Sequence, residues 1–266
     1  FHGRSISTLS ATGNPSVRAD FSPYTEGFIF VDESDLDGMR KIVEENKNVV
    51  AIFFEPILGE GGVVPLDLSV IKGIREICDE HDLLMMCDEV QSGLGRSGKW
   101  FAHQWAEIKP DVITMAKGLA GGVPVGAVIV SEKANIFKPG NHGSTFGGNP
   151  LAMRAALETL SIIEDEKLVE NALEVGKKLK KALSKSLNGF PGVRGIRGKG
   201  LMLGIVLDRD AHDILELGLK AGLTFSVTAG NVIRLVPALT INEAEADELV
   251  KRITPVIRSF LAQPKI

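Results

Sequence analysis

The sequence is poor in the features that mark several classes of protein. It has only two cysteines in 266 residues, Cys78 and Cys87, and both fall in apolar segments. Two such thiols suit packing roles in a reducing compartment better than a disulfide scaffold or a metal site. No apolar run is long enough to span a bilayer, and no basic segment followed by an apolar one marks a signal peptide. We therefore expect a cytoplasmic protein.

The sequence also has no large excess of charge of either sign. The formal net charge of -4 gives no reason to expect binding to nucleic acid or to a membrane surface. A Gly-x-Gly-x-x-Gly turn after a first strand is missing as well, which argues against a dinucleotide-binding domain. What the chain has in quantity is glycine, with 29 residues, as is typical of α/β proteins with many tight turns between strands and helices.

Apolar runs alternate with helical patterns over the first 130 residues. Short continuous apolar runs predict buried strands, and apolar residues at helical spacing predict amphipathic helices. The strands are predicted at residues 28–31, 49–55, 83–87, 112–116 and 125–130, and the helices at 35–45, 67–81 and 100–107. This alternation predicts an α/β fold with a mostly parallel, doubly wound sheet.

The pattern changes in the second half of the chain. Two helices are predicted at residues 151–164 and 167–187. Shorter strands and helices follow, with strands at 201–207, 223–227 and 232–235, a helix at 211–221 and a closing helix from Asn242. We predict a large domain over residues 1–163, and a linking helix with a small α+β domain over residues 164–266.

A carboxylate and a lysine stand at the ends of two neighbouring predicted strands. Asp88 follows the strand at 83–87, and Lys117 follows the strand at 112–116 and precedes a glycine-rich stretch. The carboxyl ends of strands in an α/β sheet are where such sheets bind ligands. A desolvated amine there can attack a carbonyl, and a carboxylate can hold a positive ring nitrogen. Those are the two protein groups that pyridoxal phosphate (PLP) chemistry requires, although either residue alone could form an ordinary salt bridge.

Five segments place these two residues in a wider pattern. They are Phe-His-Gly-Arg at residues 1–4, Glu-Pro-Ile-Leu-Gly-Glu-Gly-Gly at 55–62, Asp-Glu-Val-Gln-Ser-Gly-Leu-Gly-Arg-Ser-Gly at 88–98, Ala-Lys-Gly at 116–118 and His-Gly-Ser-Thr-Phe-Gly-Gly-Asn-Pro at 142–150. In this order they resemble the class III PLP-dependent aminotransferases, and within that class the acetylornithine aminotransferases. Leu58 departs from the family, which usually has Gln there. The resemblance covers the whole chain and implies the type I PLP-dependent transferase fold.

The resemblance implies a role for each matching residue around the cofactor. Lys117 would hold PLP as a Schiff base and move a proton between substrate and cofactor, and Asp88 would pair with the protonated pyridine nitrogen. Gln91 would donate to the phenolic oxygen, while Phe1 would stack on one ring face. A core position is the alternative for Phe1. The cofactor-binding set is Phe1, Asp88, Glu89, Val90, Gln91, Lys117 and Thr145.

The same resemblance implies the substrate contacts. Arg4 would bind the α-carboxylate of the substrate, as a planar guanidinium can do with two hydrogen bonds. Arg234 would bind 2-oxoglutarate, and Glu60 would pair with it when the amino donor is bound. A salt bridge that closes the two domains is the alternative for this pair. Ser144 and Thr145 would reach the substrate and the phosphate of a neighbouring subunit, which implies a homodimer with shared active sites.

The resemblance also implies that a phosphate-binding loop is missing from this sequence, and it implies a reaction. The phosphate-binding loop of the family would precede Phe1, so we expect that the natural protein continues upstream. The implied reaction is transfer of the ω-amino group of N-acetylornithine to 2-oxoglutarate, which gives N-acetylglutamate semialdehyde and glutamate in arginine biosynthesis. The alternatives are an ornithine, succinyldiaminopimelate or 4-aminobutyrate aminotransferase, a glutamate-semialdehyde aminomutase, or a fragment of such an enzyme without activity.

Overall fold

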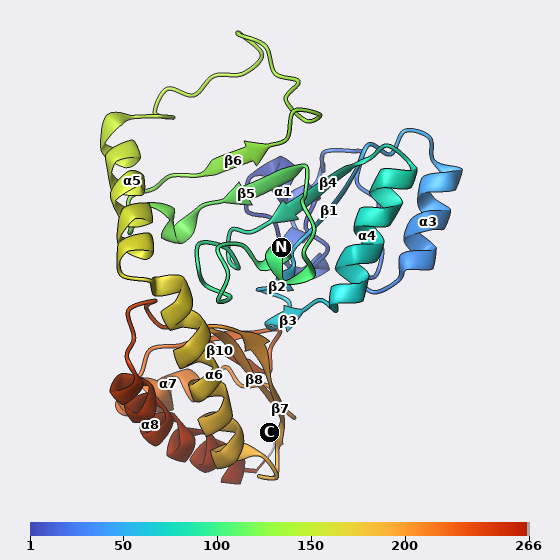
Figure 1. The fold of residues 1–266 in the computed structure, drawn as a ribbon. Helices are drawn as coiled ribbons and strands as arrows, with labels where there is room; N and C mark the ends of the chain where they lie inside the picture. The colour runs from blue at the N-terminus through green and yellow to red at the C-terminus, as the bar shows by residue number, and fades with distance from the viewer. Residues whose placement is uncertain (265–266) are drawn as a thin grey trace.

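The computed structural model describes residues 1–264, and its elements form two regions, each built on its own four-stranded sheet (Figure 1). The first sheet has the order β1-β4-β5-β6. Its strands are β1 (Ala51–Phe54), β4 (Leu84–Asp88), β5 (Val112–Met115) and β6 (Ala127–Val130). The first three strands run parallel, and β6 is antiparallel to β5. The predicted α/β fold with a mostly parallel sheet is confirmed.

Helices on this sheet form where the sequence offers an apolar face and a cap. Helices α3 (Leu36–Glu45) and α4 (Leu68–Glu80) contact each other, and α4 packs on β1 and β4. The side chain of Asp35 caps α3 by accepting a hydrogen bond of 2.8 Å from the Gly38 amide. The apolar faces of both helices meet side chains of β1 and β4 in one buried core.

Two predicted elements differ from the structure. Residues 28–31 form no strand, and their side chains are exposed. A strand needs a hydrogen-bonded neighbour, and no segment within residues 1–264 pairs with this one. The predicted helix at 100–107 is a shorter 3₁₀ helix, η1 (Ala102–Ala106). The opening segment of the chain contains two short helices, α1 (Ile6–Ser10) and α2 (Pro15–Arg18).

The second sheet is antiparallel throughout, in the order β7-β8-β10-β9. Its strands are β7 (Val193–Lys199), β8 (Met202–Leu207), β9 (Ser226–Thr228) and β10 (Val232–Leu235). Its core is completed by α6 (Leu168–Leu187), α7 (Ile214–Lys220) and α8 (Glu243–Ala262). This region is the smaller α+β unit that we predicted. Helix α5 (Pro150–Asp165) leads into it, and the domain boundary at residue 163 stays a prediction.

Hydrogen bonds from two arginines, Arg96 and Arg197, join the loops of the first region to the second region. Residues 55–65 carry a small hairpin of β2 (Ile57–Leu58) and β3 (Val64–Pro65). Arg197 of β7 donates two hydrogen bonds to the Gly62 carbonyl, at 2.9 and 2.8 Å. Arg96 donates to the carbonyls of Leu201 and Pro237, and burial lowers the pKa of this arginine to about 10. The segment after β1 is therefore fixed against the second sheet.

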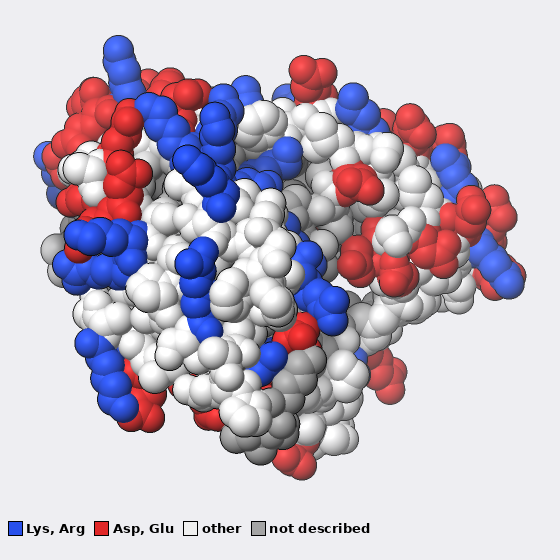
Figure 2. Space-filling view, turned by 90° about the horizontal axis from the view of Figure 1, so that it is seen from below, with Lys and Arg blue, Asp and Glu red and all other residues white. Residues whose placement is uncertain are grey.

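The surface and the cysteines add two observations. The face in Figure 2 carries both acidic and basic side chains. Within residues 1–264, no helix has both the length and the apolar character needed to cross a bilayer. Cys78 and Cys87 are buried free thiols. Burial raises the pKa of Cys78 to about 11 and that of Cys87 well above its usual value, so both remain protonated and unreactive.

Candidate active site

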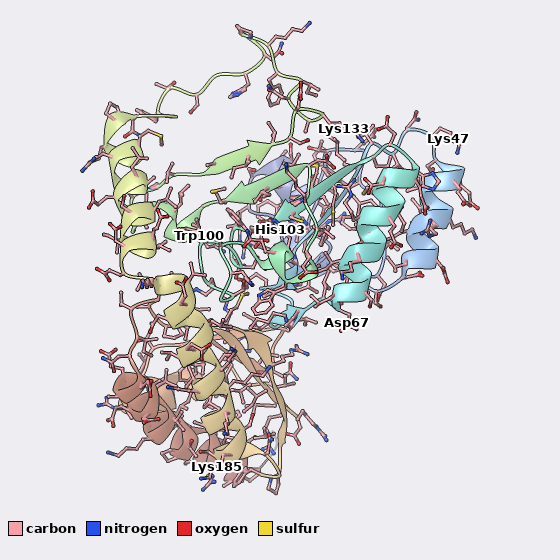
Figure 3. All side chains as sticks on the ribbon, in the orientation of Figure 1. Lys47, Asp67, Trp100, His103, Lys133 and Lys185 are labelled. Carbon is pink, nitrogen blue, oxygen red and sulfur yellow. The ribbon has the colours of Figure 1, made fainter. Side chains whose placement is uncertain are left out.

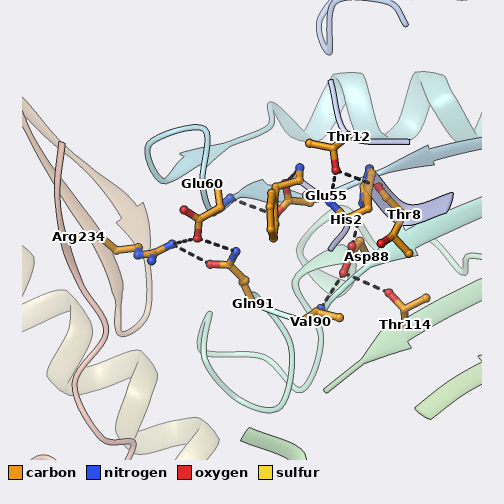
Figure 4. Close-up of polar contacts among 12 residues, drawn as sticks. His2, Thr8, Thr12, Glu55, Glu60, Asp88, Val90, Gln91, Thr114 and Arg234 are labelled. Atoms are coloured by element: carbon orange, nitrogen blue, oxygen red, sulfur yellow. Dashed lines mark hydrogen bonds and ion pairs between the residues drawn. The ribbon is translucent and has the colours of Figure 1, made fainter. Parts of the chain in front are cut away.

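Asp88 ends β4 as a buried carboxylate with three hydrogen-bond partners. Its Oδ1 accepts from the Val90 amide at 3.0 Å and from the Thr114 hydroxyl at 3.1 Å. Its Oδ2 lies 2.8 Å from Nδ1 of His2 (Figure 4). Burial opposes ionisation, but these hydrogen bonds outweigh it and lower the pKa of Asp88. The residue is therefore a negative charge fixed in the interior.

Register explains why Thr114 reaches Asp88. In the parallel ladder between β4 and β5, the Cα partner of Asp88 is Thr114. Neighbouring residues in register point to the same side of a sheet, so the hydroxyl lies beside the carboxylate. Sequence reasoning did not identify Thr114 or His2 as partners of Asp88. The only available signal was that His2 belongs to the first motif and that Thr114 is polar within an apolar strand.

Lys117 follows β5 and begins a single 3₁₀ turn, η2 (Lys117–Ala120). Its φ of 48° is in the left-handed region, which is uncommon for a residue with a side chain. Its side chain is exposed and forms no hydrogen bond or ion pair with other residues of the described chain. Neighbouring protein atoms still remove part of its hydration, which lowers the pKa of Lys117. The charges of Glu60, Glu55 and Asp88 oppose that shift, whereas Arg234 adds to it.

Glu60, Gln91 and Arg234 form a second group of contacts beside Asp88 (Figure 4). Arg234 of β10 donates to Oε1 of Glu60 at 2.8 Å and to Oε1 of Gln91 at 2.9 Å. The Gln91 amide donates to Glu60 at 3.3 Å. Burial opposes ionisation of Glu60, but Arg234 and Gln91 outweigh it and lower the pKa of this glutamate. The salt bridge named above as an alternative is thus formed, and it joins the two regions.

The backbone of the glycine-rich segment leaves room for Gln91. A Cβ on Gly59 would collide with the side-chain amide of Gln91. The Gly59 amide donates to Oε1 of Glu55, a buried carboxylate, at 3.1 Å. Any side chain at position 59 would therefore displace the Gln91 amide from its present position. Sequence reasoning placed this segment at a strand end but did not assign a role to Glu55.

Phe1 and Arg4 lie at the edge of the same cluster. The Phe1 backbone nitrogen is 2.8 Å from Oε2 of Glu55, and its side chain is half-buried. The guanidinium carbon of Arg4 lies 5.5 Å from the centroid of the Phe1 ring, within the range of a cation–π contact. Arg4 is exposed and has no hydrogen bond or ion pair among residues 1–264. Its guanidinium is available to a carboxylate.

Glu89 does not face this cluster. Its side chain is 0% exposed, and its carboxylate accepts from the Ser92 hydroxyl at 2.5 Å and from the backbone amide of His103 at 2.8 Å. The His103 ring, which Figure 3 labels in the interior, also lies 3.1 Å from that carboxylate. We had predicted Glu89 as a cofactor residue. The structure instead directs its carboxylate into the protein, where it supports the loop after β4.

Ser144 and Thr145 lie apart from Asp88 and Lys117. They belong to the segment between β6 and α5, which projects from the first sheet in Figure 1, and both are exposed. The Ser144 hydroxyl accepts only from the nearby Gly147 amide, at 3.0 Å. Asn149 caps α5 by accepting from Ala152 at 2.9 Å. The chain therefore brings together Phe1, Arg4, Glu60, Asp88, Gln91, Lys117 and Arg234, but not Ser144 and Thr145.

The residues of the cluster fit the ring half of PLP. An ionised carboxylate can accept about four hydrogen bonds, and three positions on Asp88 are taken, which leaves one for a ring N–H. Within residues 1–264 the Lys117 amine has no hydrogen-bond or ion-pair partner, and its pKa is lowered, as attack on an aldehyde requires. Within the described chain, no group of three or more His, Cys, Asp or Glu side chains is arranged to hold a metal ion.

Sequence comparisons agree with this chemistry. The family model described as "Aminotransferase class-III" matches residues 1–257. The chain is 49% identical over 264 residues to acetylornithine aminotransferase 1 of Bordetella bronchiseptica, an alignment that covers 99% of this chain and 67% of the relative. It is 46% identical over 262 residues to the acetylornithine aminotransferase of Nitrosomonas europaea, with 98% of this chain and 67% of the relative covered.

Solved structures agree as well. An ornithine aminotransferase from Toxoplasma gondii matches with a TM-score of 0.92 and 33% identity over 97% of this chain and 62% of that chain. A second structure of that enzyme is described as revealing partial occupancy of PLP at the active site. An acetylornithine aminotransferase from Elizabethkingia anophelis matches with a TM-score of 0.84 and 35% identity, over 89% of this chain and 64% of that chain. The chain thus spans less than two thirds of these solved chains.

Proposed function

The chain belongs to the class III aminotransferase family, and we propose that it transfers the ω-amino group of N-acetylornithine to 2-oxoglutarate. The products are N-acetylglutamate semialdehyde and glutamate, in arginine biosynthesis. The observation that carries the proposal is the pair of Asp88 and Lys117 at the ends of adjacent parallel strands. Asp88 is a fixed anion, and the Lys117 amine has no hydrogen-bond or ion-pair partner in the described part of the chain. Identities of 46–49% to acetylornithine aminotransferases support this donor.

Asp88 has the task of holding a positive charge. PLP, the cofactor of this family, supplies an electron sink when it is bound. That property depends on a proton at the ring nitrogen, and an ionised carboxylate beside this nitrogen stabilises the proton. Asp88 stays ionised because His2, Val90 and Thr114 offset its burial. A fixed charge in a site with little water acts more strongly than the same charge in solution.

Lys117 has two tasks in the proposed reaction. Its neutral amine would hold PLP through the aldehyde of the cofactor, and a lowered pKa enlarges the neutral share of the amine. Once freed by the amine of the substrate, Lys117 would act as the base that takes the proton from the carbon bearing the substrate nitrogen, and then as the acid that gives that proton back. Gln91 would donate to the phenolic oxygen of PLP, and Phe1 and Val90 would cover the ring.

Arg234 and Glu60 form the proposed switch between the two substrates. With the amino donor bound, the salt bridge at 2.8 Å stays closed and neutralises Arg234. When 2-oxoglutarate enters, its carboxylate replaces Glu60 as the partner of Arg234, because a guanidinium can bind either carboxylate with parallel hydrogen bonds. Arg4 binds the α-carboxylate of the amino acid. One site can thus accept both substrates in turn.

The remaining two site residues require a second chain. Ser144 and Thr145 are exposed on a projecting segment, and the hydrogen bonds of residues 144–149 stay within it, so we propose that they act in the site of a partner subunit in a homodimer. Thr145 would contact the phosphate of PLP there. The proposed compartment is the cytoplasm, because the chain keeps its two cysteines as buried free thiols.

The test is an assay of the purified chain with PLP. N-acetylornithine and ornithine are supplied separately as donors with 2-oxoglutarate, and glutamate formation is measured. We expect glutamate with both donors, a higher kcat/KM for N-acetylornithine, and parallel lines in double-reciprocal plots, as in a ping-pong reaction. A higher kcat/KM for ornithine would refute the proposed donor. No glutamate from either donor would refute the activity of this chain.

A further inference from the structure

His2 is held in one orientation by three contacts. Its backbone amide donates to the Thr12 hydroxyl at 3.0 Å. Its ring stacks on Phe53 of β1, with centroids 3.9 Å apart and planes inclined by 24°. Its Nδ1 lies 2.8 Å from Oδ2 of Asp88, and only 9% of its side chain is exposed. Packing and hydrogen bonding together therefore leave the imidazole little freedom.

The chain around His2 is fixed as well. Thr12 is fully buried, and its hydroxyl donates to the Thr8 carbonyl at 3.0 Å. Gly3 has a φ of 126°, and a Cβ at this position would lie 2.7 Å from the Thr8 hydroxyl. The turn after His2 therefore requires glycine. The segment from His2 to Thr12 forms a rigid support behind Asp88.

The direction of the hydrogen bond follows from the charge of Asp88. An ionised carboxylate can only accept, so Nδ1 of His2 carries the proton and donates. Val90 and Thr114 both donate to Oδ1, which leaves His2 as the only protein partner of Oδ2 within residues 1–264. Removal of this donor would leave Oδ2 buried without a partner, and burial would then favour the protonated, neutral acid.

We propose that His2 is a positioning residue that keeps Asp88 ionised and directs its Oδ2 toward the pyridine nitrogen of PLP. This inference rests on the role proposed above for Asp88. Packing alone does not account for His2, because an apolar ring could stack equally well on Phe53. The imidazole is instead placed so that its Nδ1 meets Oδ2 of Asp88, the carboxylate oxygen to which Val90 and Thr114 do not donate.

Two substitutions separate the hydrogen bond from the packing. His2→Phe keeps a ring against Phe53 and removes the donor, whereas His2→Asn keeps an N–H near the position of Nδ1 and removes the ring. His2→Leu is a second variant without a donor, for use if the phenyl ring does not fit. His212→Phe is the matched control, because His212 also lies 3.0 Å from an aspartate, Asp210, but on the surface.

Two measurements that do not depend on turnover report how the His2 substitutions change Asp88 and the bound cofactor. Carbon-13 NMR of the Asp88 carboxyl, in the chain without PLP, gives its pKa, and nitrogen-15 NMR of ring-labelled PLP gives the protonation of the bound pyridine. We expect His2→Phe to raise the pKa of Asp88, shift the pyridine signal toward the neutral form and weaken PLP binding about tenfold. His2→Asn should restore most of each value, and His212→Phe should change none.

The outcomes distinguish this inference from the proposed function. If His2→Phe and His2→Leu leave both NMR signals and PLP affinity unchanged, the inference is wrong, whatever the activity of the chain. If His2→Phe raises the pKa of Asp88 but the wild-type chain binds PLP with a neutral pyridine, the proposed role of Asp88 is wrong, and so is the part of the inference that depends on it.

Discussion

Asp88 and Thr145 differ in how much of their surroundings the chain itself supplies. Asp88 is 6% exposed and has partners on both carboxylate oxygens, from three separate segments of the chain. Thr145 is exposed on a projecting segment, and the hydrogen bonds next to it, from the Gly147 amide to Ser144 and from the Asn149 side chain to the Phe146 carbonyl, stay within that segment. Fixed charges need to be in place before the reaction, because their orientation then costs nothing during it. A residue that serves another subunit must instead stand clear of its own.

Lys117 lies between these extremes. It follows strand β5, yet the residue is exposed and its amine has no hydrogen-bond or ion-pair partner among residues 1–264. A lysine that forms a covalent bond and later moves a proton must not be tied to the protein in the resting chain. The three residues thus form a series from fixed to free, and three substitutions test it.

The largest effect is expected from Lys117→Ala. The variant loses both the amine that binds the cofactor and the group that moves the proton, so kcat should fall by more than about 10³-fold. Borohydride reduction of the wild-type chain with PLP, followed by peptide mapping, should place the label on Lys117. Lys47→Ala, at an exposed position on the same region, is the control and should keep full activity and labelling. A label on another lysine would refute the assignment.

A smaller loss is expected from Asp88→Asn. The amide keeps the shape of the side chain but cannot stabilise a protonated pyridine, so the half-reaction with the amino donor should slow by about 10²–10³-fold. PLP should remain bound, which the visible absorbance and borohydride labelling check. Asp210→Asn serves as the control, because Asp210 also accepts from a histidine but is exposed. Turnover near that of the wild type would mean that Asp88 only caps the end of β4.

The smallest effect is expected from Thr145→Asp, which places a negative charge beside the phosphate of the partner. PLP affinity should fall roughly tenfold, and it should depend on protein concentration, because a ligand that binds only the dimer stabilises the dimer. An equal mixture of Thr145→Asp and Lys117→Ala chains should regain about a quarter of the wild-type sites through mixed dimers. No recovery in a mixture shown to form mixed dimers would refute the shared site.

Much of the fold is predictable from the sequence because the central strands β4 and β5 of the first sheet are partly or fully buried along their length. The predicted strand at 83–87 is β4 and the one at 112–116 is β5, each within a residue of its observed end. The strand predicted at 28–31 failed for the opposite reason. An apolar run satisfies the local pattern, but a strand also needs a neighbour, and local sequence does not contain that information.

The candidate site also has a part that the sequence predicts and a part that it does not. The motifs place Asp88, Gln91 and Lys117 in one site, and the family resemblance adds Arg234. Their hydrogen-bond partners were not predictable, since Thr114 meets Asp88 through strand register and His2 meets it across 86 residues of chain. Glu89 shows the limit of a motif, because adjacent residues at the end of a strand point to different sides.

The sequence by itself determined which groups are present: a lysine and a carboxylate at the ends of two apolar strands, glycines where the backbone must turn, and arginines that can bind carboxylates. Only the tertiary structure decided the state of those groups. Asp88 is ionised because His2 and Thr114, both distant in the sequence, donate to it together with the nearby Val90 amide, and Glu60 and Gln91 meet Arg234 because the second sheet packs against the loops of the first. Charge and orientation depend on neighbours in space, and those neighbours exist only after the chain has folded.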